Sequence, residues 1–90
     1  TFIDTANVYS AWVPGNAGGE SEAILGRWLK RSGARDRVVI ATKVGMKMGD
    51  GRQGLDPGYI ATALDESLRR LGPDYVDLYQ SHVDDPAVPL

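Results

Sequence analysis

The sequence predicts an α/β fold built on a parallel sheet, and three observations support this prediction. Three short strand-like runs alternate with two helix-like stretches in the order β-α-β-α-β, and strands joined by helices in this rhythm are typical of parallel sheets. The strand-like runs are almost continuously apolar, as expected when both faces of a sheet are covered. The two longest loops, 5–19 and 45–55, each follow a strand and precede a helix, which is the side of such a sheet where ligands bind.

The expected strands are Thr1–Asp4, Arg37–Val44 and Tyr75–His82. The first is a short apolar run that ends in an acidic residue. The second is rich in β-branched residues, which favour strands.

The first expected helix covers Glu20–Arg31 and is followed by Gly33, a residue that commonly ends helices. Acidic residues near its start, Glu20 and Glu22, and basic residues at its end complement the helix dipole. Its apolar side chains share one face: Ile24, Leu25, Trp28 and Leu29.

The second expected helix begins with Asp56 as the N-cap and Pro57 in the first helical position. It ends before the pair Gly72-Pro73. Its apolar residues recur at helical spacing: Ile60, Leu64, Leu68 and Leu71.

The composition excludes several classes of function. A net charge of −2 without a basic stripe argues against nucleic-acid binding, and no run approaches the roughly 18 apolar residues of a membrane span. The absence of cysteine excludes a disulfide scaffold and a thiolate zinc site, and no other metal site is expected. The chain shows no signal peptide, so a cytoplasmic location is expected.

Polar side chains occupy corresponding positions in the expected strands. Asp4, Lys43 and His82 each stand at a strand end, and Tyr9 lies in the loop just beyond Asp4. Because parallel strands place their carboxyl ends on one rim, we expect these four side chains to converge.

Such a cluster is suited to protonating an oxygen on which negative charge develops. A lysine ammonium close to a tyrosine hydroxyl favours the phenolate and makes tyrosine a better proton donor near neutral pH. An aspartate keeps the lysine charged and fixed, and a neutral imidazole can orient a carbonyl. Hydride addition to a carbonyl creates such an oxygen, and the hydride must come from a nicotinamide cofactor.

Each of these residues also has a purely structural interpretation. Asp4 could cap a turn, Lys43 could be a solvated charge, His82 could be a structural histidine, and Tyr9 could cover the sheet edge. Trp12 could line the substrate pocket or cover the first loop. The shared position of the four rim residues favours the functional interpretation.

Segments throughout the chain resemble the aldo-keto reductase family, in the order that the family has them. Residues 1–9 resemble F-x-D-T-A-x-x-Y, and residues 19–26 resemble the helix start G-x-S-E-x-x-L-G. Residues 40–43 are similar to a strand end containing A-T-K. Residues 67–82 resemble S-L-x-R-L followed by D-Y-x-D-L-x-x-x-H.

The resemblance implies that residues 1–90 form one incomplete domain, the N-terminal part of a (β/α)8 TIM barrel covering about strands 2 to 4. It also implies NAD(P)H-dependent reduction of an aldehyde or ketone, and the reverse oxidation of an alcohol. Tyr9 is then the general acid, assisted by Lys43 and Asp4, while His82 orients the carbonyl of a small-molecule substrate. Asp4 also lies near the nicotinamide ribose, and most NADP contacts are expected outside this chain. Since a complete barrel needs about 250 residues, the piece alone is expected to be inactive.

Two rival functions stay open at this point. Gly49, Gly51 and Gly54 spell G-x-G-x-x-G between a strand and a helix, so the segment could belong to a Rossmann-type dehydrogenase. The helix cap after these glycines fits that motif poorly, and a flexible substrate-side loop is the alternative. A regulatory barrel resembling potassium-channel β subunits, or a purely structural domain, could also keep the rim residues.

Overall fold

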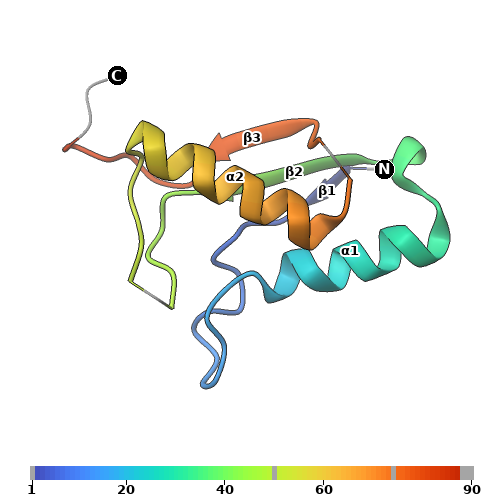
Figure 1. Ribbon diagram of the computed structural model, residues 1–90, viewed down its shortest axis with the longest axis horizontal. Helices are drawn as coiled ribbons and strands as arrows, with labels where there is room; N and C mark the ends of the chain where they lie inside the picture. The colour runs from blue at the N-terminus through green and yellow to red at the C-terminus, as the bar shows by residue number, and fades with distance from the viewer. Residues whose placement is uncertain (1, 50, 74, 88–90) are drawn as a thin grey trace.

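The computed structural model describes residues 2–49, 51–73 and 75–87. Its elements follow the predicted order, which confirms the α/β class. They are β1 (Phe2–Asp4), α1 (Glu20–Ser32), a short 3-10 helix η1 (Arg35–Arg37), β2 (Val39–Val44), α2 (Pro57–Leu71) and β3 (Leu78–Ser81) (Figure 1).

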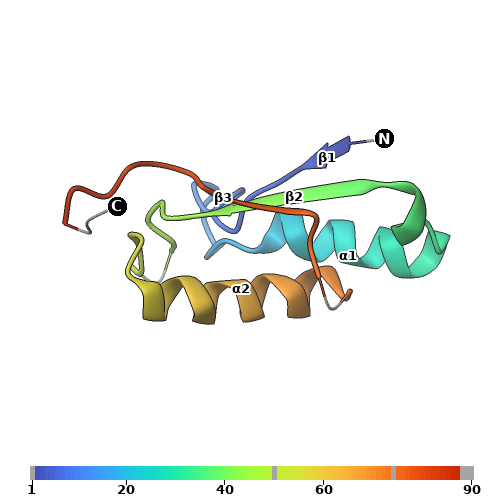
Figure 2. The same ribbon diagram turned by 90° about the horizontal axis from the view of Figure 1, so that it is seen from above.

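The three strands form one parallel sheet in the order β1-β2-β3. Phe2 pairs with Val39, and Ala41 pairs with Leu78. Both helices lie on the same side of this sheet, which leaves the other side open (Figure 2). Because the strands are parallel, the carboxyl ends of all three lie on one rim of the sheet.

The core lies between the sheet and the helices. Ile40 of β2 is fully buried and packs with Leu29 of α1 and Leu71 of α2. Burying a side chain of this size contributes about 1.5–3 kcal/mol. One residue from each of these three elements thus fixes both helices against the central strand.

The open face of the sheet is divided into two tiers. Alternate residues of a strand point to opposite faces, and on this face the strand starts are apolar whereas the strand ends are polar. The apolar tier consists of Phe2, Val39 and Leu78, which are 60%, 42% and 44% exposed. The polar tier consists of Asp4, Lys43 and Gln80.

Two strands begin later than the sequence predicts, and Thr1 lies outside the described residues. The second starts at Val39 because Arg37 N–H and Val38 N–H bond within the η1 turn, to Ala34 and Arg35 carbonyls. The third starts at Leu78 because the side chain of Asp77 accepts the Ile40 N–H at 2.8 Å, in place of a backbone carbonyl.

The second helix matches its prediction, from the Asp56 cap, which accepts from the N–H groups of Gly58 and Tyr59, to Leu71. The first helix runs one residue further than expected, to Ser32. Gly33 ends it in the left-handed conformation, φ 65°, with its N–H donating to the Leu29 carbonyl.

The predicted apolar face of α1 is only partly buried. Leu29 is buried, whereas Ile24 is 59% and Trp28 43% exposed. The buried line instead runs through Glu22, Gly26 and Leu29. The reason is that α1 packs closely on α2 at Gly26, which turns that line toward the protein and the apolar residues beside it toward solvent.

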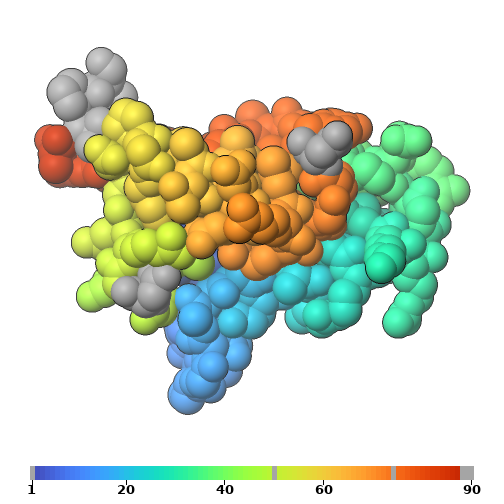
Figure 3. All heavy atoms as spheres, in the orientation of Figure 1, coloured from blue at the N-terminus to red at the C-terminus, as the bar shows by residue number. Residues whose placement is uncertain are grey.

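The loop after β1 protrudes from the body of the molecule, as the blue lobe in Figure 3 shows. Its first part is anchored by a small apolar cluster of Ala6, Val8 and Met48. Asn7 ties it to two elements. Its backbone N–H donates to the Lys43 carbonyl of β2, and its backbone carbonyl accepts the N–H of Gly19, just before α1.

Candidate active site

The rim residues predicted from the sequence lie together in the structure. Asp4 is the last residue of β1, Lys43 is the next-to-last of β2, and His82 directly follows β3. Tyr9 reaches the same rim because the anchored loop folds back over β2. The structure thus brings all four side chains to one place, while their chemical roles stay predictions.

An ion pair forms the centre of this cluster. Lys43 Nζ donates to Asp4 Oδ2 at 2.8 Å and to the Thr5 carbonyl at 2.9 Å. The Lys43 side chain is only 12% exposed, whereas that of Asp4 is 49% exposed. Burial acts to lower the pKa of Lys43, but Asp4 and the Tyr9 hydroxyl outweigh it and raise that pKa above its usual value. The ammonium is therefore charged at neutral pH.

The Tyr9 ring lies beside this ammonium, and the His82 ring lies beside Tyr9. Lys43 Nζ lies 5.0 Å from the centre of the Tyr9 ring. The Tyr9 and His82 rings meet edge to face, with 5.8 Å between their centres. A phenol, an ammonium and an imidazole are therefore close enough to act on one small molecule.

His82 is suited to act as a neutral group. Burial lowers the pKa of its imidazole, the Lys43 charge lowers it further, and Asp4 partly opposes both effects. The backbone N–H of His82 donates to the Val44 carbonyl at 2.8 Å. Its Nδ1 is buried and has no hydrogen-bond partner in the part of the chain that the structure describes. A neutral imidazole can donate one ring N–H to a carbonyl oxygen.

Trp12 lies beside the cluster and not inside it. Its ring meets that of Tyr9 edge to face at 6.2 Å, and the residue is 71% exposed. This position agrees with both interpretations of Trp12, as a wall of a substrate site and as a cover for the loop.

Sequence reasoning missed Gln80 as a member of the cluster. Its Nε2 donates to Asp4 Oδ1 at 3.4 Å. Strand alternation could have identified it, because Gln80 stands two residues before His82 and pairs with Lys43 in the sheet.

Glu22 lies in the first turn of α1, as the sequence predicts, but its burial was not predicted. It is fully buried and pairs with Arg70 at 2.7 Å. Glu20 does lie at the helix start, where its carboxylate accepts the N–H groups of Ala17 and Gly18.

A hollow of about 380 Å³ adjoins the rim. It is bordered by Gly45 and Val83, which closely follow Lys43 and His82, together with Gln53, Gly54, Asp84 and Asp85. Asp85 shapes this hollow, because its carboxylate accepts the Leu55 N–H at 2.9 Å and thereby holds the loop after β2 in place.

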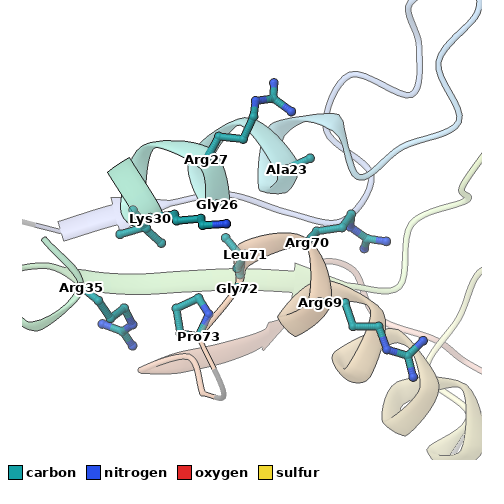
Figure 4. Close-up of a pocket in the computed structure, with 11 residues that line it drawn as sticks. Ala23, Gly26, Arg27, Lys30, Arg35, Arg69, Arg70, Leu71, Gly72 and Pro73 are labelled. Atoms are coloured by element: carbon teal, nitrogen blue, oxygen red, sulfur yellow. The ribbon is translucent and has the colours of Figure 1, made fainter. Parts of the chain in front are cut away.

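A second concavity, of about 450 Å³, lies between the carboxyl-terminal ends of α1 and α2, away from the rim (Figure 4). It is lined by basic side chains: Arg27, Lys30, Arg35, Arg69 and Arg70. Three of these, Lys30, Arg69 and Arg70, lie in the last turns of the helices, where positive charge complements the helix dipole.

The glycine-rich loop does not form a phosphate cradle. The N–H groups of Gly49, Gly51 and Gly54 donate to the carbonyls of Ala17, Met48 and Gly45. A dinucleotide fingerprint needs such groups directed at the pyrophosphate and a helix that starts among the glycines. Here α2 starts later, at Pro57, so the Rossmann alternative is wrong.

Within residues 2–49, 51–73 and 75–87, no group of three or more His, Asp or Glu side chains is placed to hold a metal ion. In the same residues, neither helix combines the length and apolarity needed to cross a bilayer.

Comparisons with known proteins give a consistent result. A model of the aldo/keto reductase family matches residues 1–90. The chain is 39% identical over 90 residues to aldo-keto reductase str7 of Strobilurus tenacellus, covering all of this chain and 24% of that protein. It is 38% identical over 86 residues to aldo-keto reductase yakc [NADP(+)] of Schizosaccharomyces pombe, covering 91% of this chain and 23% of that protein.

A solved structure from Pseudomonas aeruginosa, whose name assigns it to the aldo-keto reductases, superposes with a TM-score of 0.73 at 31% identity. The match covers 96% of this chain and 30% of that one. The chain thus spans about a quarter of the length of the curated relatives it matches. Its parallel strands and helices form part of the expected (β/α)8 barrel, and the chain belongs to the aldo-keto reductase family.

Proposed function

We propose that the protein containing this chain reduces an aldehyde or ketone to an alcohol with NADPH, and catalyses the reverse oxidation. The observation that carries the proposal is the rim cluster, in which Lys43 lies 2.8 Å from Asp4 and 5.0 Å from the Tyr9 ring centre. Carbonyl reduction needs a hydride and a proton. When bound, NADPH supplies the hydride.

In the proposed reaction, the Tyr9 hydroxyl donates its proton to the carbonyl oxygen. Lys43 favours this step because its positive charge stabilises the phenolate left behind. Asp4 holds the lysine in place and keeps it charged. In the reverse direction, the Tyr9 phenolate takes the proton from the alcohol.

His82 would orient the substrate. As a neutral imidazole facing Tyr9, it can donate a hydrogen bond to the same carbonyl oxygen. Two donors on one oxygen fix the plane of the carbonyl and stabilise the charge that develops on it. The hollow at 45, 53–54 and 83–85 would accept the remainder of the substrate.

The residues present fit a nicotinamide cofactor at one point. Asp4 is half exposed at the rim, and among the residues that the structure describes its Oδ1 receives only a long hydrogen bond from Gln80, at 3.4 Å. That oxygen can still accept a hydrogen bond from a ribose hydroxyl. The name of the Schizosaccharomyces pombe relative includes NADP(+), which supports NADP as the cofactor.

The test is Tyr9→Phe in the intact protein, measured by NADPH oxidation at 340 nm with a panel of aldehydes and ketones. Loss of the proton donor should reduce kcat by about 10²- to 10⁴-fold, while the affinity for NADPH stays the same. Tyr75→Phe is the matched control, because Tyr75 lies over Arg35, away from the rim. A Tyr9→Phe variant with full activity would remove Tyr9 from this role. A wild-type protein that binds NADPH but turns over no carbonyl would favour a regulatory barrel.

A further inference from the structure

The start of α1 contains a buried carboxylate that joins three elements of the fold. Glu22 is fully buried. Its Oε2 accepts a hydrogen bond from Thr42 Oγ1 of β2 at 2.6 Å. Its Oε1 lies 2.9 Å from Nε and 2.7 Å from a terminal nitrogen of Arg70 in α2. A carboxylate at such a site needs these partners, since burying an unpaired charge is strongly unfavourable.

Thr42 connects the buried Glu22 carboxylate to the rim of the sheet. It is fully buried on the helix side of β2 and immediately precedes Lys43, which points to the open side. Because neighbouring residues of a strand point in opposite directions, fixing the Thr42 side chain also fixes the direction in which Lys43 leaves the backbone.

Ser21 makes the equivalent contact with β1. Its Oγ lies 2.7 Å from the Thr5 Oγ1. Thr5 directly follows Asp4, and its carbonyl accepts the hydrogen bond from Lys43 Nζ. The adjacent residues Ser21 and Glu22 therefore each hold one strand end, and those two strand ends carry Asp4 and Lys43.

We propose that Ser21 and Glu22 are positioning residues that set the geometry of the Asp4–Lys43 pair from the opposite face of the sheet. Lys43 has a flexible four-carbon stem, and its ammonium is located by two acceptors on β1, namely Asp4 Oδ2 and the Thr5 carbonyl. Both acceptors keep their places relative to β2 only while the strand ends stay in register. The catalytic meaning of this inference rests on the proposed function, whereas its structural content does not.

Positioning the Asp4–Lys43 pair requires directional hydrogen bonds. A buried ion pair is often no more stabilising than well-packed apolar residues of the same size. Apolar contacts, however, do not fix direction, whereas the two hydroxyl contacts define how far each strand end lies from the helix. A displacement of about 1 Å at a catalytic group can reduce the rate by about 100-fold.

The experiment uses Thr42→Val and Ser21→Ala in the intact protein, each of which removes one hydroxyl and keeps the packing. The matched controls are Thr62→Val and Ser32→Ala, whose hydroxyls form local hydrogen bonds within or next to their own helices, with Gly58 and Ala34. Thr42→Ser keeps the hydroxyl and should restore the behaviour of the wild type.

Three readouts are compared: kcat, KM, and the titration of Lys43 followed by carbon-13 NMR of its methylene next to the ammonium. The groups that face this ammonium are Asp4, Tyr9 and His82. We expect each variant to lower kcat about tenfold, with KM within about twofold, because a modest displacement costs part of the 100-fold effect above. The Lys43 titration should move to lower pH as Asp4 and Tyr9 separate from it, and the controls should change nothing.

The inference is overturned if both variants fold and show wild-type kcat and Lys43 titration, even when their melting temperatures are lower. That result would mean that Ser21 and Glu22 contribute to stability alone. If the wild-type protein binds NADPH but turns over no carbonyl, the proposed function fails, but the Lys43 titration still decides whether the two residues position the ion pair. Should Thr42→Val not fold, Ser21→Ala decides for Ser21, and Thr42→Ala, which also removes the hydroxyl, decides for Glu22.

Discussion

Gly26 is the residue at which the two helices approach most closely, and Gly26→Ala should destabilise the protein. A Cβ at this position would overlap the Arg70 carbonyl oxygen and would lie 2.9 Å from the Leu71 carbonyl oxygen. Both obstacles are backbone atoms of α2, so no side-chain rotation can relieve them. The helices must move apart instead.

The expected magnitude follows from two opposing effects. Overpacking a well-packed site costs about 1–3 kcal/mol, and a backbone obstacle places this site near the upper limit. Replacing glycine by alanine within a helix recovers about 1 kcal/mol. The net loss in the free energy of unfolding should therefore be about 2 kcal/mol, roughly a 30-fold change in the folding equilibrium constant.

The assay is urea unfolding of the intact protein, followed by circular dichroism. The m-value of a full barrel lies above the roughly 2 kcal/mol/M of small proteins, so the midpoint should fall by no more than about 1 M. Gly58→Ala is the matched control, since it is also a glycine in a helix. Its added Cβ meets only the exposed Asp56 carboxylate, at 3.2 Å, so its midpoint should stay the same or rise. A Gly26→Ala variant as stable as Gly58→Ala would refute the close packing of α1 on α2.

Two further predictions concern the core and the rim. Leu71→Ala should reduce the free energy of unfolding by about 2–5 kcal/mol, because Leu71 is 1% exposed and packs against Ile40; an unchanged urea midpoint would contradict this. The pKa of His82 should lie below its ordinary value, because burial and the Lys43 charge outweigh Asp4, and NMR of its ring protons measures it. As the pH falls below about 6.5, the unfolded chain takes up this proton first. Stability therefore decreases through the folded-state pKa, and an elevated pKa with stability rising on acidification would disprove the assignment.

Much of the fold could be predicted from local sequence signals. The second helix is defined by Asp56, Pro57 and Gly72, whose effects act within a few residues, and its bounds were predicted correctly. Strand starts were predicted less well, because the η1 turn replaces the first residues of one strand and a distant partner sets the start of another. The β3 start, for example, depends on the Asp77 side chain occupying the Ile40 N–H, and no local pattern around 75–78 reveals that contact.

The proximity of the rim residues could be predicted from topology alone, because parallel strands bring their ends together. The layer behind them could not. In the sequence, Glu22 is one of two acidic residues in the first turn of a helix. Its burial follows from the close packing at Gly26, which turns that face of α1 toward α2. The buried Glu22 can be recognised only once its ion-pair partner Arg70 is known to lie beside it on α2.

On the open face of the sheet, the apolar tier and the polar tier occupy opposite ends of the strands. Side chains of the apolar tier, such as Val39 and Leu78, are anchored at the strand starts, whereas ionisable groups occupy only the opposite end. Substitutions at the strand starts therefore change apolar contacts while the Asp4–Lys43 pair keeps its charges. Directed evolution for thermal tolerance can vary the codons of the apolar tier and hold those of the polar tier constant.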